Sequence, residues 1–494
     1  MITREEAKGI ADKLLDMAAG KSDAAEVFVT ASERSGTRWA NSSITTNLIQ
    51  YDRNATVTVR KGQKTGSASA RDWSDAGLRK AVDEAAAEAD KAEDARNLPE
   101  LIGPQQYIEM DGALPAGISY GPAERARMVR DSIDVAQKLG VLGAGFMPKN
   151  DIATCNANSK GLFNYYRTAD VGFILTCRMA DGTGSGWSGT MGIKDPATID
   201  AKKLTEVAAN KALKSRKAKA IEPGRYTVIL EPRANARFLS LVTGIFGGGG
   251  FPGGGGFPGG GGAPPVAADT GAAGRGGRGG RGGAGADSTA AAAPPPDMFG
   301  GGMFGGGPGS AAEYMRGKKV GDKLFSDLFS LKSDVGNMVL RQSTINSDNK
   351  PAKPVTWVDK GVLGAFGPNQ GASTNQSLVQ EGSNLSIEDM IRQTRRGLLV
   401  TSFWYIRGVP ATDAPLLNTG MTRDGLFLIE NGEIAGPVQN FRWNMSPIVG
   451  YSNLTLVGKP VPMEMGEAFG SGNAALIPPV RIEEFYMTSV SPAV

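Results

Sequence analysis

The chain of 494 residues contains no histidine. Histidine is the usual general base near neutral pH and the most frequent protein ligand of transition metals. Its absence excludes a serine–histidine–aspartate triad, a cysteine–histidine pair and every zinc site that uses histidine. Chemistry carried by this chain alone would therefore depend on carboxylates, lysine, tyrosine or backbone groups.

Cysteine is nearly absent as well, with Cys155 and Cys177 as the two examples. Two thiols in a chain of this length do not make a disulfide framework, which indicates a reducing compartment. Both residues fall on neighbouring predicted strands, so they could pair with each other or bind a metal together with nearby carboxylates. We favour the simpler interpretation of two buried free thiols.

Long apolar runs and a strong net charge are also missing. The apolar stretches are far shorter than the roughly 18 residues of a membrane span, and residues 1–20 resemble a charged amphipathic helix more than a signal peptide. Lys plus Arg number 54 and Asp plus Glu 50, for a formal net charge of +4. This balance gives no support to a nucleic-acid partner. We expect a cytoplasmic protein without a membrane partner.

Glycine and proline, in contrast, are concentrated in residues 247–310. A segment so poor in aliphatic side chains cannot bury a core, and its composition predicts disorder. Three Arg-Gly-Gly repeats between Arg275 and Arg281 suggest RNA binding. Three aspartates of the same segment cancel their charge. We favour an inert solvated insertion over a nucleic-acid or self-association role.

The rest of the chain alternates between helical and strand patterns, which predicts an α+β protein rich in antiparallel sheet with flanking helices. Short runs such as those around Val27 and Val57 alternate apolar and polar residues, as half-buried strands do. We predict three units: an N-terminal α+β domain, a middle α+β domain and a C-terminal β-rich domain interrupted by the insertion. Their predicted boundaries are 1–105, 106–219 and 220–494.

Several local signals support this division. Ser74 is placed to cap a helix, and Ser386 with Asp389 forms a variant of the capping box. Asn431–Gly432 predicts a two-residue hairpin with a type I′ turn. The stretch at 181–186, DGTGSG, superficially suggests a phosphate loop, but no helix follows it, so a turn between strands is the better interpretation.

The C-terminal unit opens with a strand, Tyr226 to Leu230, that runs directly into a helix beginning at Pro232. Catalytic residues are often found where a strand runs into a helix. The helix through Phe246, however, contains no His, Cys, Asp or Glu. Its apolar residues leave almost no polar face, which predicts a buried core helix. Ser240 as a nucleophile would need an activating base that the chain lacks.

Further along, a group of arginine, asparagine and aspartate side chains crowds a β-rich segment. Buried Arg–Asp pairs that stabilise the fold are one interpretation, and a surface that guides a peptide backbone or forms a subunit interface is the other. No spacing argues for carboxylate chemistry of the glycosidase type. The candidate substrate or interface residues are Arg407, Arg423, Asp424, Asn440, Arg442 and Asn444.

This C-terminal unit resembles that of the TldD/PmbA family, whose members are described as modulators of DNA gyrase and regarded as metalloproteases. The stretches that carry the resemblance are 313–327, 395–409, 419–447 and 484–491. The first unit, at 44–70, is similar to the N-terminal domain of the family, and residues 156–188 are similar to its middle domain. The resemblance covers nearly the whole chain except 247–310.

The family has two kinds of subunit. The catalytic kind, TldD, carries a His-Glu-x-x-x-His zinc motif on the helix after such a strand, and a cysteine ligand downstream. By resemblance the motif falls on Ser240 to Ile245, with Ser240 and Ile245 in place of the histidines and Leu241 in place of the glutamate. No cysteine follows Cys177. The chain is thus similar to the companion kind, TldE or PmbA, which lacks the motif.

What the resemblance implies is a non-catalytic subunit of a TldD-type zinc metalloprotease, without catalytic or metal-binding residues of its own. Its partner in a cytoplasmic hetero-oligomer would be a TldD-type catalytic subunit that holds the zinc, and its substrates would be unfolded or extended peptides. One alternative is a stand-alone peptide- or protein-binding regulator linked to a gyrase toxin–antitoxin system. Another is a zinc-independent hydrolase.

Overall fold

The computed structural model describes residues 1–108, 112–247, 309–340, 343–367, 370–411, 414–466 and 474–491. The predicted disordered insertion at 247–310, with its Arg-Gly-Gly repeats, lies outside the described residues apart from its two ends. None of the helices in the described ranges is both long enough and apolar enough to cross a membrane. The α+β prediction is confirmed.

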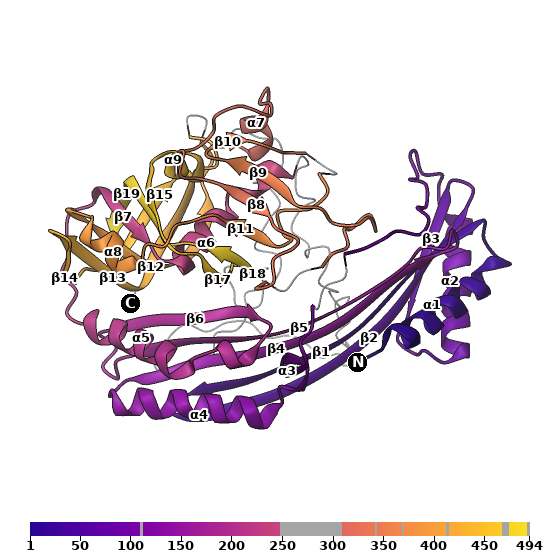
Figure 1. Ribbon diagram of the computed structural model, residues 1–494, viewed down its shortest axis with the longest axis horizontal. Helices are drawn as coiled ribbons and strands as arrows, with labels where there is room; N and C mark the ends of the chain where they lie inside the picture. Colours follow the sequence, from indigo (N-terminus) through magenta and orange to yellow (C-terminus); the bar gives the residue numbers. More distant parts are fainter. Residues whose placement is uncertain are drawn as a thin grey trace, which may run out of the picture.

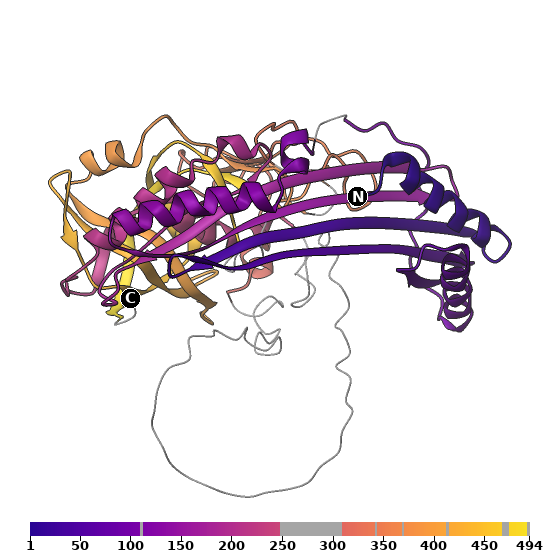
Figure 2. The ribbon, with the colours of Figure 1, turned by 90° about the horizontal axis from the view of Figure 1, so that it is seen from below.

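A six-stranded antiparallel sheet runs along the whole molecule (Figure 1). Figure 2 shows its long strands running side by side from the C-terminal unit to α1 and α2. The strand order is β3-β2-β1-β4-β5-β6. The bounds are β1 Ala24–Ala40, β2 Ser43–Lys61, β3 Lys64–Ala70, β4 Leu142–Asn158, β5 Phe163–Arg178 and β6 Ser185–Ile193.

The sequence predicted several short strands here, and that prediction was wrong. The polar centre of β1 resembles a turn, but Ser32 pairs with Asp52 of β2 on one side and with Ile152 of β4 on the other. Because both neighbours continue the ladder, the backbone groups of this polar stretch are bonded within the sheet. Two runs that look separate in the sequence therefore form one strand.

Two sets of helices cover the ends of this sheet. Helices α1 and α2 bury Val27 and Val57 at one end, and α4 and α5 bury Trp39 and Phe173 at the other. The predicted boundary at residue 105 falls in the connection after α2, while the sheet itself is continuous through the β1–β4 pairing. The helix bounds are α1 Arg4–Ala19, α2 Asp75–Lys91, α3 Pro115–Ser119, α4 Pro122–Lys138 and α5 Ala201–Lys214.

In the C-terminal unit five strands close on themselves, because β13 pairs with β12 as well as with β15. This closed five-stranded sheet has the order β12-β7-β19-β15-β13. Phe403 of β12 and Phe485 of β19 lie 5.8 Å apart although their strands are not neighbours, so both point into the ring. The bounds are β7 Gly224–Leu230, β12 Arg396–Gly408, β13 Asn418–Glu430, β15 Phe441–Met445 and β19 Val480–Val490.

Shorter elements complete the unit. A second six-stranded sheet has the order β10-β9-β8-β11-β18-β17, and α7 (Ala311–Met315), α8 (Ile387–Arg392) and α9 (Pro447–Ser452) lie around it and the ring. Strands β14 (Glu433–Pro437) and β16 (Leu454–Val457) attach to β13 and β19. The remaining bounds are β8 Leu331–Ser333, β9 Val355–Asp359, β10 Val362–Leu363, β11 Leu378–Gln380, β17 Val461–Glu464 and β18 Ala474–Ile477.

The local sequence signals are mostly confirmed. Ser74 and Ser386 accept hydrogen bonds as helix caps. Asn431 and Gly432 have φ values of 52° and 83°, both in the left-handed region, as a type I′ turn requires. The predicted core helix begins at Pro232 as expected, but α6 ends at Ser240, and Thr243–Phe246 forms a separate 3₁₀ turn.

Candidate functional site

Helix α6 (Pro232–Ser240) leads into the positions at which the resembled family carries its zinc motif. The N-terminal end of this helix contacts α5, which covers the long sheet. Glu231 is its N-cap and Pro232 its first residue. The Glu231 carboxylate accepts a 2.6 Å hydrogen bond from the Lys211 ammonium group of α5. Both side chains are at most 15% exposed. Because breaking such a pair would leave a charge uncompensated, the contact holds α6 against α5.

Contrary to the sequence prediction, α6 has polar residues on its buried surface. Asn235 is fully buried and makes three bonds: it accepts one from the Tyr451 hydroxyl and donates to the Gln380 side chain and the Pro478 carbonyl, each at 2.8 Å. These bonds satisfy both ends of its amide group. They connect α6 to β11, to α9 and to the short connection before β19.

Two arginines of α6 are equally buried and lie over tryptophan rings. Arg233, 2% exposed, lies 5.4 Å from the Trp187 ring of β6 and donates to the Glu464 carbonyl at 2.9 Å. Arg237, 3% exposed, lies 5.4 Å from the Trp404 ring of β12. A desolvated cation over an aromatic face is attracted by the ring quadrupole. The contact with Trp187 joins α6 to the long sheet, and the contact with Trp404 joins it to the closed five-stranded sheet.

Arg423 of β13 lies 5.9 Å from the same Trp404 ring, so this ring contacts two guanidinium groups. We call Arg233, Arg237, Arg423, Trp187 and Trp404 the arginine–tryptophan cluster. Arg423 was predicted from the sequence, and the other four residues were not. The available signal was the i, i+4 spacing of Arg233 and Arg237 in a largely apolar helix, which places both on one face.

Three of the six predicted candidates share one face of the closed sheet. Thr419 of β13 pairs with Arg407 of β12 and with Asn444 of β15, and Met421 pairs with Arg442. Directly paired residues point to the same side. Trp443, between Arg442 and Asn444, points into the ring, so these polar residues point outward. We call this surface the outer face of β12, β13 and β15.

The side chains on this face are half-buried. Arg442 donates to the Thr419 hydroxyl at 3.3 Å, and Arg407 lies 4.3 Å from the Tyr405 ring. Asn440 accepts a 2.9 Å bond from Thr422. The Oδ1 atom of Asn444 is buried and has no hydrogen-bond partner among the described residues. Such a face can donate to and accept from the backbone of an extended peptide.

Asp424 lies elsewhere, where the C-terminal unit contacts the long sheet. Its backbone has a φ of 58°, in the left-handed region, and its carboxylate accepts a 2.6 Å hydrogen bond from Ser185 at the start of β6. The predicted candidates therefore divide between two places. Asp424 contacts the long sheet, and the others lie on or next to the outer face, with Arg423 against the Trp404 ring.

The residues at the expected metal positions do not fit zinc. Ser240 donates its hydroxyl hydrogen to the Arg237 carbonyl at 2.7 Å. Leu241 and Ile245 offer no donor atom, and Ile245 is buried in the apolar core. Among the described ranges no three His, Cys, Asp or Glu side chains gather as a set of metal ligands. We therefore derive no chemical step through a metal on this helix.

The two cysteines occupy separate cores, Cys155 beneath α1 and α2 and Cys177 beneath α4 and α5. Both are free and buried. Burial raises the pKa of each thiol to about 12, because the thiolate would lose its hydration. A thiol with so high a pKa is a poor nucleophile and a poor metal ligand at neutral pH.

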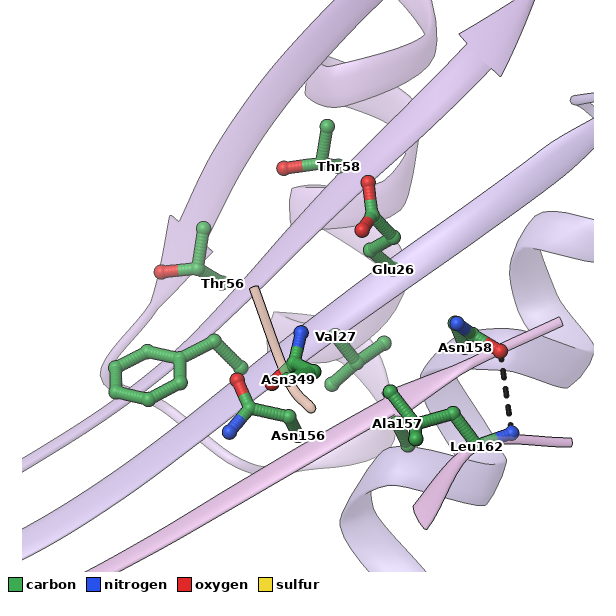
Figure 3. Close-up of a pocket in the computed structure, with 10 residues that line it drawn as sticks. Glu26, Val27, Thr56, Thr58, Asn156, Ala157, Asn158, Leu162 and Asn349 are labelled. Atoms are coloured by element: carbon green, nitrogen blue, oxygen red, sulfur yellow. Dashed lines mark hydrogen bonds between the residues drawn. The ribbon is translucent and has the colours of Figure 1, made fainter. Parts of the chain in front are cut away.

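A pocket of about 200 Å³ lies on the long sheet (Figure 3). Glu26, Thr56, Thr58 and Asn156 line it together with Asn349 of the C-terminal unit. The Glu26 carboxylate is paired with Arg60 at 2.7 Å. A single carboxylate that is already paired with an arginine is not placed for acid–base catalysis, so we assign no chemistry to this pocket.

Two family descriptions match parts of the chain. The PmbA/TldA metallopeptidase C-terminal domain matches residues 310–489, and the PmbA/TldA metallopeptidase domain 1 matches residues 25–89. No curated protein sequence matches the chain significantly. The C-terminal match contains the outer face, and the N-terminal match contains β2.

Solved structures resemble the chain over nearly its full length. TldE from Thermococcus kodakarensis has a TM-score of 0.74 at 16% identity, covering 97% of this chain and 100% of its own. A candidate modulator of DNA gyrase from Thermotoga maritima has a TM-score of 0.72 at 15% identity, covering 97% and 99%. One from Bacteroides thetaiotaomicron has 0.71 at 15%, covering 99% and 100%. At these identities the likeness shows the fold alone.

Proposed function

Because the chain belongs to the PmbA/TldD metallopeptidase family, we propose that it is a non-catalytic, TldE-like subunit of a TldD-type zinc metalloprotease. In this proposal a cytoplasmic hetero-oligomer degrades unfolded or extended peptides. The zinc and the water that it activates belong to the TldD-type partner. This chain supplies part of the wall of the shared chamber and contacts to the substrate.

The observation that carries the proposal is the set of residues at the expected metal positions, from Ser240 at the end of α6 to Ile245 in the following 3₁₀ turn. A zinc protease needs ligands, an open coordination position and a general base. Ser240, Leu241 and Ile245 provide none of these, and the whole chain has no histidine with which to build them elsewhere. The surrounding family fold is nevertheless complete, which favours a role in assembly and substrate binding.

In the proposed assembly the outer face of β12, β13 and β15 binds peptide backbone or the partner. Arginine offers five N–H donors in a fixed plane, which suits the carbonyl oxygens of an extended chain. Arg407 and Arg442 would donate to such carbonyls, beside Asn444 on the same face. Arg423, Asp424 and Asn440 would extend this surface toward the long sheet.

The test is degradation of a casein-like unfolded protein by this chain, by a TldD-type partner and by an equimolar mixture. We expect cleavage by the mixture, loss of cleavage with a metal chelator, and no cleavage by this chain alone. Elemental analysis of the untagged chain should find no stoichiometric zinc.

Two results would refute the proposal in different ways. Chelator-sensitive cleavage by this chain alone would show that it is catalytic after all. A partner that is equally active without this chain would show that no shared chamber exists. A folded, tightly packed protein serves as the control substrate, because the mixture should leave it intact.

A further inference from the structure

Arg423 and Arg442 lie close together on the outer face of β12, β13 and β15. Met421 of β13 pairs with Trp404 of β12 on one side and with Arg442 of β15 on the other. Arg423 follows Met421 by two residues along the same strand, so its side chain shares that face. The two arginines are therefore diagonal neighbours, near enough for both long side chains to reach one ligand.

The Arg423 guanidinium group lacks acceptors for its N–H groups. Among the described residues it makes neither a hydrogen bond nor an ion pair, and its Nε atom is buried. It lies 5.9 Å from the centre of the Trp404 ring. An aromatic ring covers the face of a guanidinium group and leaves the donors in its plane unpaired. Because an unpaired charged donor costs free energy where it is buried, an acceptor in that plane would be stabilising.

Arg225 of β7 shows how the same arrangement looks when it is complete. Arg225 lies 5.4 Å from the Tyr486 ring, and the Glu484 carboxylate lies 4.0 Å from its Nε atom. Both arginines belong to the closed five-stranded sheet, and both have an aromatic ring on one side. Arg423 has the ring without the carboxylate. The comparison indicates which chemical group is missing at Arg423.

The described acidic side chains leave both arginines of the outer face without an ion pair. Arg442 donates to the Thr419 hydroxyl at 3.3 Å and pairs with no described carboxylate. Asp424, next to Arg423 in the sequence, instead accepts a 2.6 Å hydrogen bond from Ser185 of the long sheet. Like charges on one face of a sheet repel each other. A carboxylate bound between the two arginines would offset this repulsion and accept from both.

We propose that Arg423 and Arg442 form a carboxylate-binding site that selects extended peptides with aspartate or glutamate side chains. The planar fork of arginine matches the two oxygens of a carboxylate. Alternate side chains of an extended peptide point to the same side, so such a peptide can present its carboxylates to this face. The site rests on the proposed function and deepens it, because it names acidic segments as the class of peptide that the outer face binds.

The test measures the binding of end-blocked peptides to the chain alone by isothermal titration calorimetry. Blocked ends leave side chains as the only carboxylates in a peptide of alternating Ser and Glu. This peptide should bind at least about tenfold more tightly than the same peptide with Gln in place of Glu. Arg423→Gln and Arg442→Gln should each weaken its binding at least about tenfold. Arg423→Lys should restore only part of the loss, since lysine keeps the charge without the planar fork.

The matched control is Arg225→Gln, which removes an arginine that lies over an aromatic ring of the same sheet. This variant should bind the Glu peptide like the parent. Melting temperatures show whether each variant folds, and Arg423→Lys keeps the test decisive if Arg423→Gln does not fold. The measurement needs neither zinc nor a partner subunit, so its failure is distinct from a failure of the cleavage assay.

Two results would overturn the carboxylate site directly: equal binding of the Glu and Gln peptides, or unchanged binding in the folded variants of Arg423 and Arg442. Two others would assign the arginines to a different ligand. Inorganic phosphate that binds more tightly than the Glu peptide would indicate a site for a free oxyanion. Variants that lose only co-elution with a TldD-type partner would indicate a subunit interface.

Discussion

Helix α6 and the outer face of β12, β13 and β15 carry the same kinds of side chain in opposite environments. On α6, Arg233, Asn235 and Arg237 are at most 3% exposed, and each contacts other elements of the fold. On the outer face, Arg442 and Asn444 are half-buried and only partly bonded. The difference separates polar residues that stabilise the fold from those to which the proposed function assigns ligand binding.

The largest effect should come from the aromatic group that α6 buries. Phe238 lies 5.3 Å from the Tyr451 ring and 5.6 Å from the Phe485 ring, and it is fully buried. Phe238→Ala should lower the free energy of unfolding by about 3–5 kcal/mol, since it removes the ring and leaves a cavity. Urea denaturation measures the loss. A decrease below about 1 kcal/mol would show that α6 is not a structural helix.

Asparagine allows a direct comparison of the two regions. Asn235→Ala should lower the free energy of unfolding by about 2–3 kcal/mol, because it leaves the buried Tyr451 and Gln380 groups without this partner. Asn444→Ala should cost less than about 1 kcal/mol, because its buried oxygen bonds to nothing described. Equal losses in the two variants would remove the distinction drawn between the regions.

Alkaline pH should weaken the two cores of the long sheet. The Cys155 and Cys177 pKa values are raised to about 12 by burial, whereas an unfolded thiol titrates near about 8.5. The folded thiols keep their protons where unfolded thiols lose them. Their contribution is complete below about pH 8.5 and is lost as the pH rises toward the folded value.

The free energy of unfolding should thus fall by about 1.4 kcal/mol per pH unit for each thiol between about pH 9 and pH 10. Denaturation at several pH values measures this slope. Cys177→Ala should remove about half of the contribution from the two thiols. An unchanged slope in this variant would show that other groups control the alkaline transition.

The smallest effects on stability should come from Arg442→Ala and Ser240→Ala, each within about 1 kcal/mol of the parent. Their effects on function should differ. In the mixture with a TldD-type partner, Arg442→Ala should reduce peptide turnover or assembly, whereas Ser240→Ala should not change either. Turnover assays and co-elution of the two subunits measure this. Equal activity of both variants would exclude the outer face from substrate binding and assembly.

Local structure could be predicted from the sequence where one or two residues decide it. Ser74 and Ser386 cap their helices because a side-chain oxygen reaches a free N–H of the first turn. The Asn431–Gly432 hairpin follows from the tolerance of these residues for positive φ. The length of β1 could not be predicted, because Ser32 looks like a turn residue until its partners on both sides are known.

The candidate site, too, could be predicted from the sequence only in part. Arg442 and Asn444 were found by their density in a short segment, and the strand register then places Arg407 beside them. Arg233, Arg237, Trp187 and Trp404 were missed, because they belong to three elements that meet only in the folded chain. A buried arginine in an apolar helix cannot be recognised before its aromatic partner is known.

By itself the sequence determined the α+β class, the caps and hairpins, and the lack of any histidine with which to bind zinc or catalyse. These properties depend on residue type and on neighbours a few positions away. Only the tertiary structure decided that five strands close into a ring, that α6 buries two arginines and that Arg423 and Arg442 share one face. Pairing and burial depend on contacts between residues far apart in the chain, which local pattern does not contain.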